Sequence, residues 1–280
     1  RIHKKKVFKK IFIYEKSNSN ILKIKKLKLP CKIIDKIDEG TTNYDLIIFC
    51  TPMSEYKKII LKINKFIPPN CLITDIGSSK VVTSKIIQKF LKKKISWVSS
   101  HPIAGSEVSG PEHGKSNMFV NRWCILIKEK NTKKNDLKIL DKFWKKIGSK
   151  TVVMSSEKHD KIFSMTSHLP HLIAYNLVKS AQEFEKKQNY NLIKFSAGGL
   201  RDFSRIAASN EVMWRDIFFN NKNNVSKAIN LFIKSLNEFK KDINLKDNKS
   251  ILKKLTQTKK VRSKIIKLKQ DVNKPDFGRN

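Results

Sequence analysis

The sequence contains few of the residues that break a chain or cross-link it. Its 280 residues include only nine glycines, eight prolines and four cysteines. Cysteines 31, 50, 71 and 124 lie far apart and form no Cys-x-x-Cys pair. This spacing argues against a zinc site and against a disulfide framework. We therefore expect reduced thiols and a cytoplasmic location.

Arginine is also scarce, because only seven of the 60 basic residues are arginine and the rest are lysine. The formal net charge of +36 would by itself be compatible with nucleic-acid binding. A phosphate-binding surface favours clustered arginines and stacking aromatic side chains, whereas these lysines are spread along the whole chain. We expect no nucleic-acid partner, and a basic nucleic-acid-binding protein remains the alternative from another functional class.

Long apolar runs are missing as well. No stretch of about 18 consecutive apolar residues occurs, so we expect no membrane span and no membrane partner. The first residues, RIHKKKVFKK, contain neither an initiator Met nor the apolar segment of a secretory signal. Hydrophobic residues still make up 39% of the chain, which argues against wholesale disorder and is enough for a sizeable core.

In the first half of the chain, short apolar runs alternate with stretches whose apolar residues recur at helical spacing. Most of the runs are continuous rather than alternating, which is typical of strands buried on both faces of a parallel sheet. Strands that alternate with helices predict a Rossmann-like, doubly wound α/β sheet. The predicted strands are 11–15, 46–52, 71–77, 97–103, 123–128 and 151–156, and the predicted helices are 54–67, 78–93 and 135–148.

After about residue 156 the strand-like runs stop and long amphipathic patterns follow, so we expect an all-α region. Helices of this length with one apolar face usually pack against another surface, which predicts a homodimer formed through them. We divide the chain into an α/β domain (1–156), a helical domain (157–270) and a loose tail (271–280).

The strand predicted at 11–15 ends in Glu15. In a dinucleotide-binding fold, the acid at this place binds the adenosine ribose and favours NAD over NADP. The glycine-rich turn should lie roughly 20 residues earlier, yet no glycine precedes Gly40 and no Gly-x-Gly-x-x-Gly occurs anywhere. We interpret this as the loss of the first strand and its phosphate loop. The chain as written is therefore predicted to bind NAD⁺ poorly or not at all.

Polar residues and turn residues follow two further strands. Because ligands of open α/β sheets lie beyond the carboxyl ends of the strands, we expect the cofactor to contact these places. A structural proline turn and a helix N-cap by Ser78 are the alternatives. The predicted cofactor contacts are Thr51, Pro52, Asp75 and Gly77, with Ser78 expected beside the reacting groups.

The segment HPIAGSEVSGPEHG (101–114) follows the next strand directly. His101 stands at the strand end, where a histidine can take up or release a proton close to neutral pH. Ser106 and Glu107 add polar groups a few residues later. A single histidine here would more often be structural, but the third successive polar strand end favours a catalytic one.

Two motifs in the helical region carry further candidates. His168 and His171 lie three residues apart, but Pro170 between them argues against a regular metal-binding face, and we expect no metal. A helix start that contacts the substrate is the interpretation we favour. In a chain that uses lysine by default, the arginines of GGLRDFSRIAASNEVMWRD (198–216) indicate a need for the planar guanidinium, and Arg205 is the better candidate for binding a carboxylate.

Together these motifs resemble the prephenate/arogenate (cyclohexadienyl) dehydrogenase family of the TyrA type. DIGSSK, SHPIAGSEVSGPEHG, TSHLPH and GGLRDFSRIAASNEVMWRDI occur in the family's order, and the likeness extends over residues 7–265. The resemblance implies NAD-dependent oxidative decarboxylation of prephenate or arogenate in tyrosine biosynthesis, with a homodimer formed by the helical domain.

By this resemblance, His101 takes the proton of the ring hydroxyl and Ser78 orients its imidazole. Arg205 would hold a substrate carboxylate, and His171 would lie near the side chain of the substrate. The remaining residues that the resemblance places around the pocket are Ser106, Glu107, Ser167 and Trp214. The choice between prephenate and arogenate and feedback by tyrosine stay open. Another NAD-dependent dehydrogenase with a helical domain, or an inactive fragment, is the alternative.

Overall fold

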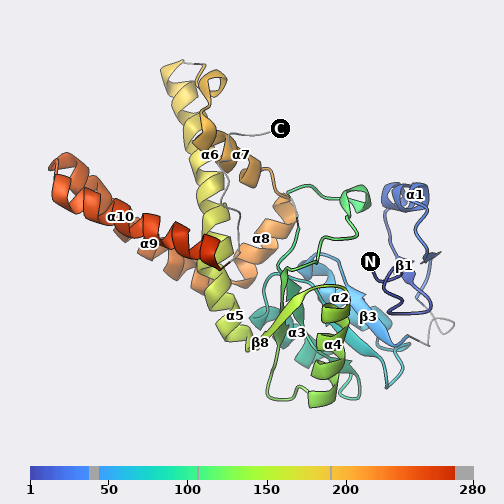
Figure 1. Ribbon diagram of the computed structural model, residues 1–280. Helices are drawn as coiled ribbons and strands as arrows, with labels where there is room; N and C mark the ends of the chain where they lie inside the picture. Colours follow the sequence, from blue (N-terminus) through green and yellow to red (C-terminus); the bar gives the residue numbers. More distant parts are fainter. Residues whose placement is uncertain (38–43, 106, 190, 269–280) are drawn as a thin grey trace.

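The computed structural model describes residues 1–37, 44–105, 107–189 and 191–268, which form an α/β half followed by a helical half (Figure 1). Ser106 and the tail predicted at 271–280 lie outside the described residues. The change from strands to helices falls between Met154 and Ser156. This architecture confirms the predicted fold class.

The strands of the α/β half pair in three groups. β1 pairs with β2 in parallel, and β4 lies between β3 and β5 and is parallel to both, whereas β7 is parallel to β8 but antiparallel to β6. The prediction missed β2 and the antiparallel pair. The strands are β1 (Phe12–Tyr14), β2 (Lys32–Ile34), β3 (Leu46–Phe49), β4 (Leu72–Asp75), β5 (Ser96–Trp97), β6 (Ser100–Pro102), β7 (Trp123–Ile127) and β8 (Lys150–Met154).

The strand predicted at 97–103 is in fact two strands joined by a bend. The Val98 amide donates to the carbonyl of Ile73, which extends the pairing of β5 with β4. The Ile127 amide then donates to the carbonyl of Ser99, which starts the pairing of β7 with β6. The chain thus passes from one sheet to the next within two residues, and His101 lies just beyond this crossing.

Helices cover the sheets and bury one face each. Tyr56 and Ile60 of α2 are fully buried, as is Leu140 of α4, while lysines occupy many of the exposed positions of the same helices. The helices of this half are α1 (Asn18–Lys26), α2 (Tyr56–Ile63), α3 (Val81–Phe90) and α4 (Lys134–Lys146), with short 3₁₀ turns η2 (Met53–Glu55) and η3 (Pro111–His113).

The helical half starts with one long helix that contains a wider π-helical turn. None of the helices in the described ranges combines the length and apolar character needed to cross a membrane. The elements are α5 (Ser156–Phe163), the π turn η4 (Ser164–His168), α6 (Leu169–Gln188), η5 (Ile193–Phe195), α7 (Gly198–Ala207), α8 (Glu211–Asn220), α9 (Lys222–Asn244) and α10 (Asn248–Lys267).

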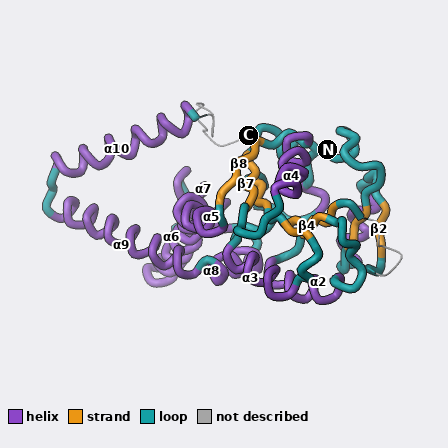
Figure 2. The backbone as a smooth tube through the Cα atoms, turned by 90° about the horizontal axis from the view of Figure 1, so that it is seen from below, coloured by secondary structure: helices purple, strands orange, loops and turns teal. Residues whose placement is uncertain are grey.

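The two halves share a hydrophobic core. Trp214 and Ile217 of α8 are buried in the same cluster as Ile73 of β4 and Tyr56 of α2. By contrast, α9 and α10 project away from the α/β half in both views (Figures 1 and 2). The interface between the halves is therefore a packed one, and the candidate site lies along it.

Candidate active site

His101 begins a chain of buried polar groups. Its Nδ1 lies 2.8 Å from Nε2 of His159 at the start of α5, and Nδ1 of His159 lies 2.8 Å from Oδ1 of Asp160. His159 and Asp160 are fully buried, and His101 is 9% exposed. Phe163 packs against both imidazole rings, with ring centroids 4.9 Å and 4.4 Å away. His101, the histidine predicted from the sequence, is therefore positioned by contacts with His159 and Phe163 of the helical half.

Asp160 also holds the start of α3. The amide of Lys80 donates to Oδ1 of Asp160 at 2.8 Å, and the amide of Val81 donates to Oδ2 at 2.9 Å. The first amides of a helix have no partner within the helix, and the positive end of the helix dipole favours an anion there. A side chain from the helical half thus caps a helix of the α/β half.

The side chain of Lys80 forms a second buried link. Its Nζ lies 2.7 Å from Oδ2 of Asp75 and donates to the carbonyl of Ser100 at 2.6 Å. The same carboxylate oxygen accepts from Tyr56 and from the amide of Gly77. Burial lowers the pKa of Lys80, while the charge of Asp75 acts in the opposite direction. We refer to Asp75, Lys80, His101, His159 and Asp160 as the inner cluster.

Burial keeps the histidines of the inner cluster neutral. Removal from water, together with the charge of Lys80, lowers the pKa of His159 to about 2. Burial also lowers the pKa of His101 well below its ordinary range, and the neighbouring charges of His159, Lys80 and His168 act in the same direction. A neutral imidazole has one nitrogen free to accept a proton, which a general base requires.

A second group of residues lies further out, on the helical half and on the loop after β6. Nδ1 of His171 lies 3.0 Å from the carbonyl oxygen of Ser167, and the ring of His171 stacks on that of Trp214 at 3.8 Å. Arg205 of α7 forms an ion pair with Glu107. The arginine side chain is 59% exposed and the glutamate 31%. We refer to these five residues as the outer cluster.

The π turn helps to place the outer residues. Pro170 has no N–H to donate to the preceding turn, and its ring would clash with the carbonyl of residue 166 in a regular helix. The wider turn at Ser164–His168 fits directly before it. His168 on this turn is buried, and a charge on its ring acts to lower the pKa of His101 further. Burial lowers the pKa of His171, while the hydrogen bond with Ser167 and the charge of Glu107 act in the opposite direction. His168 therefore lies within electrostatic reach of His101 in the inner cluster and of His171 in the outer cluster.

The predicted cofactor residues lie at the carboxyl ends of β1, β3 and β4. Glu15 is partly exposed, and its carboxylate accepts from the amides of Lys16 and Ser17 at 2.7 Å and 2.9 Å. Each carboxylate oxygen can accept more than one hydrogen bond, so this group remains suited to the hydroxyls of a ribose. Thr51 and Pro52 are exposed just after β3.

Asp75 and Gly77 shape the same edge in another way. Asp75 is fully buried and binds Lys80, so its effect on a cofactor would pass through its hydrogen bond to the amide of Gly77. A Cβ atom at Gly77 would lie 2.9 Å from Cγ of Met53 and from the hydroxyl of Tyr56, which leaves no room for a side chain. The bare backbone at this strand end and the acceptor at Glu15 fit a dinucleotide.

The sequence pointed to His101 but not to its partners. His159 and Asp160 stand in EKHDKIF, a polar helix start, and their one signal is that they share a helix face with the buried Phe163. Ser78 is half-buried, and no hydrogen bond joins its hydroxyl to His101 among the described contacts. No group of three metal-binding side chains occurs among the residues that the structure covers.

Comparison with known protein families accounts for almost the whole chain. Residues 1–153 match the family described as Prephenate dehydrogenase, nucleotide-binding domain, and residues 155–257 match Prephenate dehydrogenase, dimerization domain.

Individual relatives agree with these matches. The chain is 31% identical to the cyclohexadienyl dehydrogenase of Zymomonas mobilis over 90% of its own length and 86% of the relative's. It is 31% identical to the prephenate dehydrogenase of Bacillus subtilis over 78% of its length, which spans 59% of that protein. A crystal structure of prephenate dehydrogenase from Aquifex aeolicus, in complex with hydroxyphenyl propionate and NAD⁺, superposes with a TM-score of 0.88 at 33% identity, covering 94% of this chain and 92% of that one.

Proposed function

The chain belongs to the prephenate dehydrogenase family, and we propose that it catalyses the oxidative decarboxylation of prephenate or arogenate in tyrosine biosynthesis. It is an oxidoreductase, and its cofactor NAD⁺ supplies the hydride acceptor when bound. The observation that carries the proposal is the buried His101 of β6, whose imidazole is held by the ring of His159.

The reaction needs one proton acceptor in the protein. A hydride leaves C4 of the cyclohexadienyl ring while the C4 hydroxyl gives its proton to His101. Loss of CO₂ from C1 then makes the ring aromatic and leaves the former hydroxyl oxygen as a phenolate, which takes the proton back from His101 to give the phenol. A positioned general base contributes typically ~10²–10⁴-fold to the rate of such a proton transfer, and aromatisation drives the reaction forward.

The outer cluster suits an anionic substrate. Arg205 presents a planar guanidinium that can bind a carboxylate through two hydrogen bonds. Its partner is Glu107, which a substrate carboxylate would replace. His171, stacked on Trp214, and Ser167 would line the side-chain end of the pocket. We propose Ser78 as a further contact near the reacting hydroxyl.

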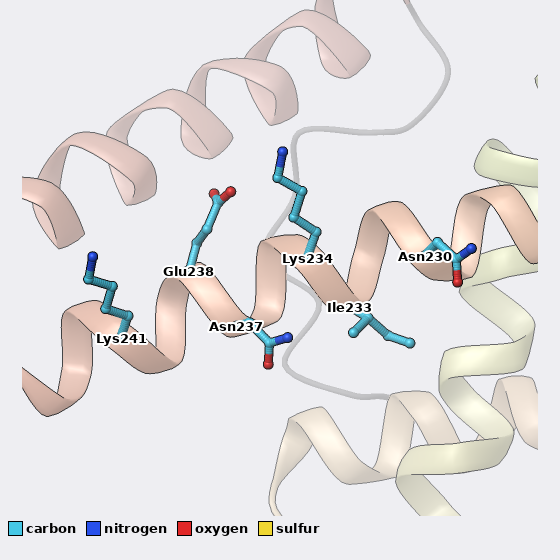
Figure 3. A pocket seen from close by; sticks show the side chains of 6 residues that line it. All are labelled: Asn230, Ile233, Lys234, Asn237, Glu238 and Lys241. Atoms are coloured by element: carbon cyan, nitrogen blue, oxygen red, sulfur yellow. The ribbon is translucent and has the colours of Figure 1, made fainter.

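The helical half provides the surface that we propose for the homodimer. The apolar side chains of α9 and α10 are largely exposed, and a shallow groove runs along α9 alone (Figure 3). A helix of the partner subunit would cover the exposed apolar side chains and the groove. The exposed apolar residues on these two helices include Leu231, Ile233, Leu236, Ile243, Leu252, Leu255 and Val261. We propose residues 1–156 as the nucleotide-binding domain, 157–270 as the substrate and dimerisation domain, and the cytoplasm as the location.

Initial rates with both substrates and both cofactors test this function. The purified chain is mixed with prephenate or arogenate and with NAD⁺ or NADP⁺, and 4-hydroxyphenylpyruvate, tyrosine and reduced cofactor are measured. We expect product from at least one substrate, with NAD⁺ preferred because Glu15 would repel a 2′-phosphate. Absence of product from both substrates, in protein shown to be folded by circular dichroism, would contradict the proposal. Titration of NAD⁺ measures cofactor binding separately.

A further inference from the structure

We infer that His159 and Asp160 are positioning residues that fix the tautomer of His101, so that its Nε2 is the nitrogen that accepts the substrate proton. The inference rests on the proposed function, because it concerns the base of that reaction. It follows from the direction in which hydrogen bonds run along the buried chain from Asp160 through His159 to His101.

The direction is set at Asp160. Both carboxylate oxygens already accept backbone amides from the start of α3, at 2.8 Å and 2.9 Å. Burial raises the pKa of Asp160, while the hydrogen bonds from these two amides act in the opposite direction. The amides have only protons to offer, and the helix start favours the ionised carboxylate. The short contact from Oδ1 of Asp160 to Nδ1 of His159, also 2.8 Å, must therefore have the proton on the imidazole. His159 donates through Nδ1.

The next hydrogen bond then has only one possible direction. His159 is fully buried and lies near the cationic Lys80, so its ring is neutral and carries a single N–H. Because that proton is on Nδ1, the Nε2 atom of His159 is an acceptor. Nδ1 of His101, 2.8 Å away, must be the donor. This leaves Nε2 of His101 unprotonated, with its lone pair available to the ring hydroxyl.

The same chain supports the charge that forms during the reaction. When Nε2 of His101 takes the proton, its Nδ1–H becomes a charge-assisted donor to His159, which strengthens that hydrogen bond. The anion of Asp160 lies behind His159 and favours the cationic ring. The resemblance gave the orientation of the imidazole to Ser78, whereas the contacts in this structure give it to His159.

Nitrogen NMR tests the tautomer in the unaltered protein. With ¹⁵N-labelled histidine, protonated and unprotonated ring nitrogens have well-separated shifts, and the His101 signals are identified by their loss in His101→Ala. We expect Nδ1 of His101 in the protonated range and Nε2 in the unprotonated range at neutral pH. A His101 signal with the proton on Nε2 would overturn the inference, whether or not any variant folds.

Replacement of His159 by glutamine or by asparagine, whose side-chain amides differ in reach, provides a matched test of its role. In His159→Gln the amide oxygen can reach the position of Nε2 and accept from His101, whereas in His159→Asn the shorter amide keeps only the contact with Asp160. We expect kcat to fall about 100-fold in His159→Asn, within the contribution of a positioned base, and at most about tenfold in His159→Gln, with KM little changed. A purely structural tether to Asp160 predicts the reverse order, and that order would overturn the inference.

The two proposals fail in different ways. If the unaltered chain makes no product from either substrate, the proposed function fails, but the NMR measurement of the His101 tautomer still stands. If the unaltered chain is active and His101 carries its proton on Nε2, the function stands and the positioning role of His159 fails.

Discussion

The inner and outer clusters of the site are held in opposite ways. Asp75, Lys80, His159 and Asp160 are fully buried, and each makes several short hydrogen bonds. The ion pair of the outer cluster, Arg205 with Glu107, joins two partly exposed side chains. A buried ion pair is costly to break, whereas an exposed one can be exchanged at little cost. The difference indicates that the proton acceptor is built once, during folding, and that the substrate contacts are remade in every catalytic cycle.

Loss of the base should give the largest effect. We expect His101→Ala to lower kcat by about 10²–10⁴-fold with little change in KM, because the variant removes the proton acceptor and leaves the outer cluster intact. Steady-state assays of product formation measure kcat and KM. His113→Ala is the matched control, since His113 is an exposed histidine of the same segment. Comparable rates for the two variants would remove His101 from the mechanism.

Breaking the buried ion pair should mainly affect stability. Lys80→Met leaves the Asp75 carboxylate buried without its cation, and we expect the free energy of unfolding to fall by about 3–5 kcal/mol in urea titrations. Lys145→Met removes an exposed partner of Asp141 and should cost less than about 1 kcal/mol. Equal losses of unfolding free energy in the two variants would show that burial does not make the Lys80–Asp75 pair more important for stability than the exposed pair.

The inner and outer clusters should also differ in how much they contribute to the pH dependence of stability. The pKa of His159 is lowered to about 2, whereas the unfolded chain has a histidine pKa of about 6.5. Between these values the unfolded state binds more protons, so the stability contributed by neutral His159 is complete above about pH 6.5 and is lost as the pH falls. We expect His159→Gln to remove about 2 kcal/mol of the loss between pH 7 and pH 5. His171→Gln, in the half-buried outer cluster, should remove less.

The smallest effect should come from the outer ion pair. Arg205→Ala is expected to raise KM about tenfold, the loss of roughly one charge-assisted hydrogen bond, while kcat changes little. Glu107→Gln frees the guanidinium from its carboxylate partner and should lower KM about twofold, in keeping with an exposed pair. An increase in KM for Glu107→Gln would mean that Glu107 binds the substrate instead of competing with it.

The same contrast explains what the sequence could predict. The fold class was predictable because buried strands are local patterns, and His101 was singled out because a polar segment follows a strand-like run. The three-residue strand β2 was missed, since Lys32–Ile34 is too short to form a pattern. The bend at Val98 and Ser99 was missed because an uninterrupted run of strand-forming residues predicts one strand.

The partners of His101 could not be predicted in the same way. His159 is 58 residues away in the chain, and the packing of α5 against α3 and β7 brings the two rings together. In the sequence, His159 and Asp160 look like ordinary polar residues at a helix start. Their burial depends on the arrangement of the two halves, which no local pattern contains.

The cap that Asp160 places on α3 has a consequence for how the molecule can be divided. The helical half supplies the acceptor for the first amides of α3, and Asp216 likewise accepts the amide of Ser54 in η2. An excised nucleotide-binding segment would leave these amides uncapped and would expose the core surface that Trp214 and Ile217 cover. The two halves are thus not interchangeable modules, and a chimera with a foreign helical half would need both acceptors at the same places in order to unfold as one cooperative unit.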